Sequence, residues 1–247
     1  MAARASSAWQ RGTVADDYLE RRRTIPLWAE ATELVRRLVE RAPRSIGRLL
    51  DLGSGDGFVA ELVLETHPES EAVLVDFSSP MLDAAERRLS SKAGRWQAVE
   101  ADLSSPSWLE ALPEQSGYDA VLSGLCIHHL PHERKRALYE EVLELLSPKG
   151  LFLNWEHVAT DGLASGLFDE ERIARLVRVE RERPAPRPAE EVAREYRERP
   201  DAKENKLLDV ETQCRWLRSI GFEGVDIYFK WCELALFGGV KPARGDS

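Results

Sequence analysis

RLLDLGSGDGFVAELVL, residues 48–64, runs from a short apolar segment through three closely spaced glycines into an amphipathic pattern. Such a cluster of glycines is costly, because glycine loses more conformational entropy than any other residue when a fold fixes it. A strand, a glycine turn and a helix in this order present backbone N–H groups and the positive end of a helix to a ligand. The stretch therefore predicts a ligand-binding turn between a strand over 46–52 and a helix over about 57–66.

Apolar runs and helical patterns alternate along most of the chain, which is typical of βαβ units around a parallel sheet. An opening helix is expected over IPLWAEATELVRRLVERA, and Ser79 is expected to cap the helix that follows the second strand. The last two apolar runs, GVDIYFKW and ELALFGGVK, are too close for a parallel crossover and are expected to form an antiparallel hairpin. Further strands are expected over 72–76, 96–102, 118–125 and 150–156, and further helices over 105–112, 132–146 and 210–220.

Residues 158–208 break this alternation, because they are rich in arginine and glutamate and contain a PAPRP interruption. They can be a solvated helix pair with many charge pairs, or a helical lid over a ligand pocket. Their place after the fifth strand favours the lid, since ligands bind beyond the carboxyl ends of strands in such sheets. We expect one domain over 1–247, with N-terminal helices in 1–44, a cofactor-binding half in 45–157, the lid in 158–208, and the last helix and hairpin in 209–247.

Charge and composition narrow the functional classes. The formal net charge of −9 disfavours a nucleic-acid partner, because an acidic surface repels phosphates. No run approaches the roughly 18 apolar residues of a membrane span, and the N-terminus lacks the apolar core of a signal peptide. Three cysteines without a CxxC pair fit a reducing compartment and should be buried fillers. We therefore expect a cytoplasmic protein without a membrane partner.

The glycine turn could serve a dinucleotide, which is marked by GxGxxG. Here Gly53, Gly55 and Gly57 give GxGxG, and Phe58 stands where the third dinucleotide glycine would be. Asp51 would also lie close to a pyrophosphate and repel it. A nicotinamide-dependent oxidoreductase is therefore disfavoured and is kept as an alternative.

Four motifs in order resemble the class I S-adenosylmethionine-dependent methyltransferases. DLGSGDG is similar to their motif I, and VLVDFSSPML at 73–82 to motif II. EADL at 100–103 resembles the acidic position after strand three, and YDAVLSGLCIHHL at 118–130 the strand-four motif. The resemblance implies an α/β fold: a Rossmann-like, doubly wound, seven-stranded sheet with an antiparallel last strand. N-terminal helices and a helical insertion after strand five are expected to complete it.

The resemblance also implies a set of cofactor-binding residues. Asp51 and the carbonyls around Gly53 would accept from the ammonium group of S-adenosylmethionine, and Asp76 would accept from both ribose hydroxyls. Asp102 would accept from the adenine amino group, next to the Leu103 amide. The remaining expected contacts are Ser54, Gly55, Gly57, Phe77, Met81, Ser123 and, from the N-terminal segment, Tyr18.

Methyl transfer from a sulfonium mainly requires that the protein align the acceptor with the methyl group, and a general base helps when the acceptor carries a proton. His128 and His129 follow the fourth strand, and Glu156 and His157 follow the fifth. Histidine, with a pKa of about 6.5, suits proton abstraction at neutral pH. The HHL sequence can also be only a structured turn, and the four residues could instead collect a metal ion. Nothing in their spacing demands a metal, so none is expected.

The favoured hypothesis is a methyltransferase that acts on an O, N or C atom of a small molecule, as a monomer or homodimer. A tRNA-modifying methyl- or carboxymethyl-transferase-like enzyme is the first alternative. The others are the nicotinamide-dependent oxidoreductase and a cofactor-binding protein without turnover.

Overall fold

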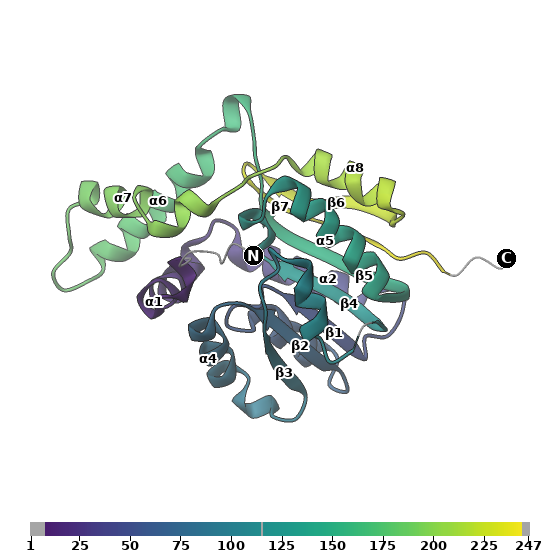
Figure 1. Cartoon of the computed structure of the whole chain (residues 1–247). Coiled ribbons are helices and arrows are strands. Elements are labelled where there is room, and N and C mark those ends of the chain that lie inside the picture. The colour runs from purple at the N-terminus through teal and green to yellow at the C-terminus, as the bar shows by residue number, and fades with distance from the viewer. Residues whose placement is uncertain (1–7, 115, 244–247) are drawn as a thin grey trace.

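The computed structural model describes residues 8–114 and 116–243. Seven strands form one sheet in the order β3-β2-β1-β4-β5-β7-β6 (Figure 1). β1 to β5 are parallel, whereas β7 pairs antiparallel with both β5 and β6, so the predicted fold class and hairpin are confirmed. The strands are β1 (Arg48–Leu52), β2 (Glu71–Asp76), β3 (Trp96–Glu100), β4 (Tyr118–Gly124), β5 (Leu146–His157), β6 (Glu223–Trp231) and β7 (Leu234–Val240).

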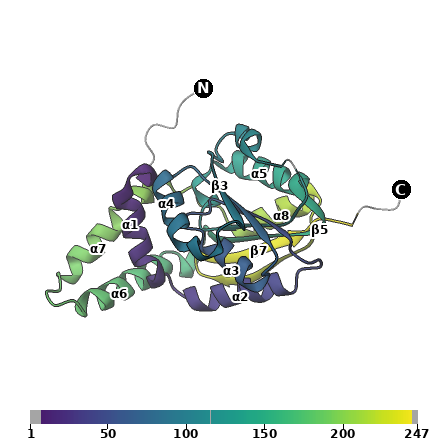
Figure 2. The same ribbon diagram turned by 90° about the horizontal axis from the view of Figure 1, so that it is seen from below.

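Helices cover both faces of the sheet, as Figure 2 shows for α2 and α3 on one side and α5 and α8 on the other. α1, α6 and α7 lie together beyond one end of the sheet. None of the described helices combines the length and apolar character that crossing a bilayer requires. The helices are α1 (Gly12–Arg21), α2 (Trp28–Glu40), α3 (Phe58–Thr66), α4 (Ser79–Arg88), α5 (His132–Leu145), α6 (Leu167–Arg181), α7 (Ala189–Arg197) and α8 (Val210–Ile220).

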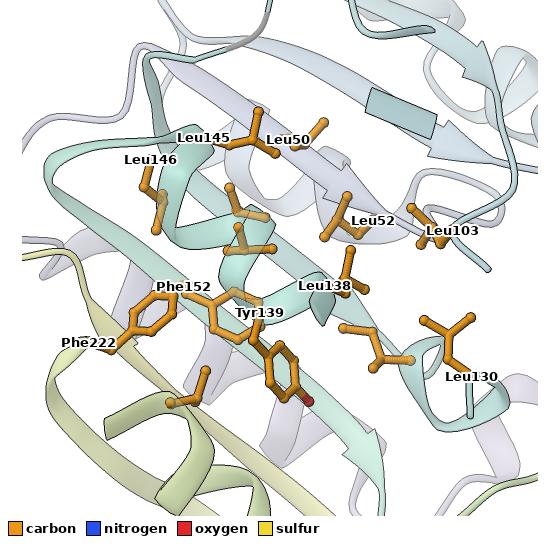
Figure 3. Close-up of a cluster of buried hydrophobic side chains, with 14 of the residues drawn as sticks. Leu50, Leu52, Leu103, Leu130, Leu138, Tyr139, Leu145, Leu146, Phe152 and Phe222 are labelled. Carbon is orange, nitrogen blue, oxygen red and sulfur yellow. The ribbon is translucent and has the colours of Figure 1, made fainter. Parts of the chain in front are cut away.

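The core between the sheet and α5 is built from leucines and stacked aromatic rings (Figure 3). Phe152 of β5 lies between Tyr139 and Phe222, with ring centroids 5.5 and 5.7 Å away. The buried Tyr139 hydroxyl donates to Gln213 at 2.6 Å and accepts from the Asn154 amide at 3.2 Å. Apolar packing and satisfied polar groups thus fix α5 and α8 against the strands whose ends form the site.

Several expected boundaries differ from the observed ones: β1 and β3 are each two residues shorter than expected, and the helix expected over 105–112 is a 3-10 helix over Pro106–Ala111. Three further differences have a clear local description. Ser78, not Ser79, caps α4, since its Oγ accepts from the Met81 amide. The opening helix begins at Trp28 rather than Ile25, because Leu27 adopts a left-handed conformation with φ of 55°. β5 begins at Leu146, which pairs with the first residue of β4 across a register shift.

The segment after β5 forms the predicted helical insertion, with charge pairs along α6 and α7. We call residues 158–208 the lid, and their closing over a ligand stays a prediction. The lid helices α6 and α7 share a small apolar cluster, and they are tied to α1. Arg21 of α1 pairs with Glu195 of α7 at 2.6 Å. At the start of α6, the Glu233 carboxylate accepts from the Gly166 amide at 2.5 Å and the Phe168 amide at 3.1 Å. The hairpin turn therefore holds the lid to the sheet.

Gly238→Ala should unfold the protein more easily, because a Cβ atom at Gly238 would lie 2.0 Å from the carbonyl oxygen of Phe152. Separating β7 from β5 should lower the free energy of unfolding by about 3 kcal/mol in urea denaturation. Gly12→Ala is the control, since its methyl group would meet no atom within 4 Å. Wild-type stability for Gly238→Ala would contradict this β5–β7 contact.

Candidate active site

The glycine turn after β1 is left-handed at all three glycines: φ is 62° at Gly53, 53° at Gly55 and 73° at Gly57. A Cβ atom at Gly53 would lie 1.9 Å from the Cys126 sulfur, in the loop after β4. The two loops therefore approach too closely for any side chain at this position. Cys126, expected to be a buried filler, is instead partly exposed, as is Cys232, whereas Cys214 is buried as expected.

A cavity of about 680 Å³, which we call the glycine-turn cavity, opens at the ends of β1, β2 and β4. It brings together eight of the predicted cofactor residues: Tyr18, Asp51, Gly53, Ser54, Gly55, Asp76, Phe77 and Met81. The sequence did not single out several other residues that line it, among them Trp9, Trp28, Asp56 and Phe58.

Two buried carboxylates lie at the floor of this cavity. Asp51 Oδ2 accepts from the Ala60 amide at 3.0 Å, whereas its Oδ1 has no hydrogen-bond partner among the residues that the structure describes. Burial raises the pKa of Asp51 to about 8. Asp76 accepts from the amides of Gly55 and Ser78, both at 2.8 Å, and burial raises its pKa to about 6. The orphaned Asp51 oxygen suits a cationic group in the cavity.

A side cavity of about 350 Å³ adjoins the first, and Asp102 and Leu103 line it together with Gly53, Asp76 and Phe77. Asp102 accepts from the Ser104 amide at 2.8 Å and from the Ser104 hydroxyl at 2.7 Å. A carboxylate has about four lone-pair sites, so these bonds leave acceptor capacity toward the cavity.

Gly57 and Ser123 are placed differently, because neither lines these cavities in the described part of the chain. A Cβ atom at Gly57 would lie 2.9 Å from the Leu89 side chain, so this glycine lets α3 begin against α4. Ser123 donates its hydroxyl to the Leu52 carbonyl at 2.9 Å and joins β4 to β1. Direct cofactor contact by these two residues stays a prediction.

Arg22 and Asp56 form a buried ion pair that sequence reasoning missed. Arg22 Nη1 and Asp56 Oδ1 are 2.5 Å apart, and Arg88 adds a second contact to Asp56 at 2.6 Å. The Arg22 guanidinium also lies 5.2 Å from the ring centroids of Trp28 and Phe58. The sequence showed only a basic run at 21–23 and an aspartate among glycines, and nothing local indicated that these would meet.

A larger cavity of about 980 Å³, the lid cavity, lies between α1, the lid helices and the loops after β4 and β5. It shares four lining residues with the glycine-turn cavity: Trp9, Tyr18, Leu125 and His129. Trp9 and His129 also line the side cavity, so all three cavities meet at these two residues.

The four candidate catalytic residues form one cluster at this junction. His128 Nδ1 lies 2.6 Å from Glu156 Oε1, which also accepts from the His157 amide at 2.9 Å. The His128 ring centroid is 3.9 Å from that of His129 and 5.7 Å from that of His157. The three histidines line the lid cavity, and Glu156 lies buried behind them.

Burial controls the charges of this cluster. It lowers the pKa of His128 and of His157 to about 3, and it raises the pKa of Glu156 to about 7. At neutral pH both imidazoles are therefore neutral, and burial makes them weak bases. A nearby ionised carboxylate such as Glu156 opposes this effect by stabilising the imidazolium. In the described ranges, no group of three histidine, cysteine or acidic side chains is arranged to hold a metal ion.

Comparison with known proteins agrees with this geometry. Residues 49–150 match the family model described as "Methyltransferase domain". The structure aligns with an O-methyltransferase family protein from Burkholderia thailandensis, with a TM-score of 0.65, 17% identity, and coverage of 91% of this chain and 59% of that one. It also aligns with human N-acetylserotonin methyltransferase in complex with SAM, with a TM-score of 0.54, 15% identity, and coverage of 92% and 58%.

Curated relatives match either nearly the whole chain or only its methyltransferase-like part. Carboxy-S-adenosyl-L-methionine synthase from Helicobacter hepaticus is 24% identical over 231 residues, which cover 90% of this chain and 88% of that protein. Demethylmenaquinone methyltransferase from Chlamydia caviae is 36% identical over 103 residues, but these cover only 41% of this chain and 40% of that protein. Residues 49–150 are thus similar to a methyltransferase domain, and the chain has the fold of the class I methyltransferases.

Asp51→Asn should change how stability depends on pH. The pKa of Asp51 is about 8 in the fold against 3.8 for the ordinary group, so the fold disfavours the charged form. The wild type therefore loses stability as pH rises from about 4 to about 8. Relative to the wild type, Asp51→Asn should gain roughly 2 kcal/mol or more between about pH 5 and pH 8, measured by urea denaturation. Unfolding free energies of the wild type and Asp51→Asn that change in parallel with pH would contradict a raised pKa at the buried Asp51. Asp17→Asn, at an exposed position, is the control.

Proposed function

We propose that this protein transfers a methyl group from S-adenosylmethionine to an O, N or C atom of a small-molecule acceptor. The observation that carries this proposal is the pair of cavities with a shared wall. One cavity is built on the glycine turn of a methyltransferase domain, and the other is larger and is bounded by histidines. A cofactor in the first cavity and an acceptor in the second would meet at Leu125 and His129.

The residues of the glycine-turn cavity fit this cofactor. The unpaired Oδ1 of Asp51 suits the ammonium group, and the bare backbone at Gly53 admits the methionine chain. Asp76, held by two amides, is positioned to accept from ribose hydroxyls, while Asp102 and Leu103 border the side cavity where adenine would lie. When bound, S-adenosylmethionine supplies an electrophilic methyl group on a sulfonium.

The chain's own contribution is alignment and proton removal. We assign the Nδ1 proton of His128 to the hydrogen bond with Glu156, which leaves Nε2 as the proton acceptor. Glu156 then positions the ring and stabilises the imidazolium that forms when the acceptor loses its proton. His129 borders both cavities and contacts the acceptor beside the cofactor, and His157 completes the wall.

The relatives with matching segments are named for different kinds of acceptor. A demethylmenaquinone methyltransferase agrees with a small acceptor, a malonyl-[acyl-carrier protein] O-methyltransferase from a Paenibacillus species is named for a carrier-bound one, and two others are a release factor glutamine methyltransferase and a ribosomal RNA methyltransferase. The preference for a small acceptor therefore rests on the lid cavity and the net charge. The net charge of −9 disfavours RNA, including the tRNA of the alternative hypothesis. We place the protein in the cytoplasm as a monomer or homodimer.

A second candidate function follows from the relative that spans nearly the whole chain. Its name states that it forms carboxy-S-adenosyl-L-methionine, and the alignment covers the lid as well as the methyltransferase domain. Mass spectrometry of the nucleosides formed from S-adenosylmethionine in a metabolite extract separates the two functions. The proposed reaction yields S-adenosylhomocysteine, and the alternative yields a carboxylated cofactor.

Cofactor binding is tested with S-adenosylhomocysteine, which should raise the melting temperature, whereas NAD and bulk tRNA should not. Asp76→Asn should weaken S-adenosylhomocysteine binding by roughly tenfold or more in isothermal titration, because it removes a charged acceptor. Asp83→Asn, on α4 outside the three cavities, is the control. Stabilisation by NAD instead would favour the oxidoreductase, and no response to S-adenosylhomocysteine would exclude the proposal.

Glu156→Gln should lower the transfer of labelled methyl groups to an extract-derived acceptor by about 100-fold, while leaving S-adenosylhomocysteine affinity within about twofold. The wild-type rate should rise with pH through about 7 as Glu156 ionises, and this rise should be absent in the variant. His129→Ala should also slow transfer, and the exposed Glu171→Gln should not. Wild-type rates for both Glu156→Gln and His129→Ala would remove the cluster from the mechanism.

A further inference from the structure

Arg172 of α6 is a buried cation on the wall of the lid cavity. Only 7% of it is exposed. Its Nη2 donates to the Arg21 carbonyl at 3.2 Å, and its Nε has no acceptor. Within the described residues, no carboxylate lies within ion-pair distance of its guanidinium. A carbonyl oxygen carries no net charge, and Asp201, which attracts this cation from a distance, is itself paired with Arg199. We call Arg172 uncompensated in the sense that it has no direct ion pair among the described residues.

Burying a guanidinium without an ion pair costs free energy of folding. Burial lowers the pKa of Arg172, but a guanidinium keeps its proton because its ordinary pKa lies above about 12. A buried charge without a partner opposes folding, so proteins pair buried charges or use them. An uncompensated arginine that faces a cavity therefore indicates an anionic ligand.

The other charged residues around the cavity do not fulfil this role. Arg21 is paired with Glu195 at 2.6 Å, and Arg199 with Asp201 at 3.3 Å. The remaining carboxylate of the wall, Asp17, is exposed. Arg172 is thus the uncompensated cation among the described residues that line this cavity.

The rest of the wall is largely apolar. Beyond the charged groups and the histidines, the lid cavity presents aliphatic and aromatic side chains from α1, the β4 loop and α6, including Val14, Ile25, Leu125, Phe168 and Leu176. This surface suits a hydrocarbon or aromatic body.

We propose that the lid cavity binds an amphipathic carboxylic acid, whose carboxylate is held by Arg172 and whose apolar body extends toward His129. This inference rests on the proposed function and names the acceptor class of that same site. One uncompensated cation matches one carboxylate charge, and the planar guanidinium can bind both carboxylate oxygens. Arg172 lines the lid cavity, where the acceptor would bind, whereas Arg22 lines the glycine-turn cavity, where the cofactor would bind. We therefore assign the carboxylate at Arg172 to the acceptor and not to the cofactor.

The test uses the full chain saturated with S-adenosylhomocysteine. Phenylacetate, 3-phenylpropionate and 4-phenylbutyrate are titrated by calorimetry, each against its own carboxamide, with phenyl phosphate as a further probe. At least one acid should bind about tenfold more tightly than its amide, since a charge-assisted pair is worth about 1.5–3 kcal/mol. Arg172→Gln should abolish this preference, and Arg172→Lys should retain part of it.

Arg175→Gln is the matched control, because Arg175 lies on the same helix, pairs with Glu171 at 2.9 Å and does not line the cavity. It should keep the preference for acids. The proposal is wrong if no acid binds the wild type better than its amide, or if Arg172→Gln keeps the preference. It is also wrong if phenyl phosphate binds most tightly. Should Arg172→Gln not fold, an undiminished preference in Arg172→Lys overturns it.

Binding of S-adenosylhomocysteine and methyl transfer are measured separately on each variant. S-adenosylhomocysteine should bind all of them within about twofold of the wild type, since the two cavities use different arginines. Loss of binding in the wild type would refute the proposed function. Intact cofactor binding and methyl transfer, with labelled products that carry no carboxylate, would refute the acceptor class alone.

Discussion

The site depends on one close contact between two loops. At Gly53 a Cβ atom would lie 1.9 Å from the Cys126 sulfur, so the turn after β1 can meet the loop after β4 only as bare backbone. This contact lies where the sheet order reverses between β1 and β4, the point at which open α/β sheets bind ligands. It brings the buried Asp51, the Asp76 carboxylate and the histidine loop to one edge.

Charge is distributed unequally across that wall. The glycine-turn cavity contains buried carboxylates whose pKa values are raised by burial, whereas the lid cavity contains neutral imidazoles and the buried Arg172. Each side therefore favours a ligand of different charge: a cation near Asp51 and an anion near Arg172. Because the interior screens charge weakly, this asymmetry would orient a cofactor and an acceptor under the proposed function.

Local sequence patterns predicted the secondary structure elements, because these depend mainly on nearby residues. The seven strands, the antiparallel hairpin and the helical insertion were predicted from periodicity and spacing, and the glycine motif located the glycine-turn cavity. The cap of α4 was assigned to Ser79 instead of Ser78, because two neighbouring serines cannot be distinguished as caps from the sequence alone. The pairing of Arg22 with Asp56 and the isolation of Arg172 could not be predicted, because both depend on how distant helices pack. The sequence supplied the candidates, and tertiary packing decided which charges were compensated.

Trp9 borders all three cavities, and the carbonyl of this residue accepts a hydrogen bond from the Ser78 hydroxyl at the start of α4. Its indole also lies edge-on to Tyr18, with ring centroids 5.2 Å apart. A single residue thus borders both sides of the wall. Under the proposed function, an indole ordered by one ligand would strengthen the binding of the other, and thermodynamic reciprocity makes this effect equal in both directions. The N-terminal turn would then couple the two binding equilibria.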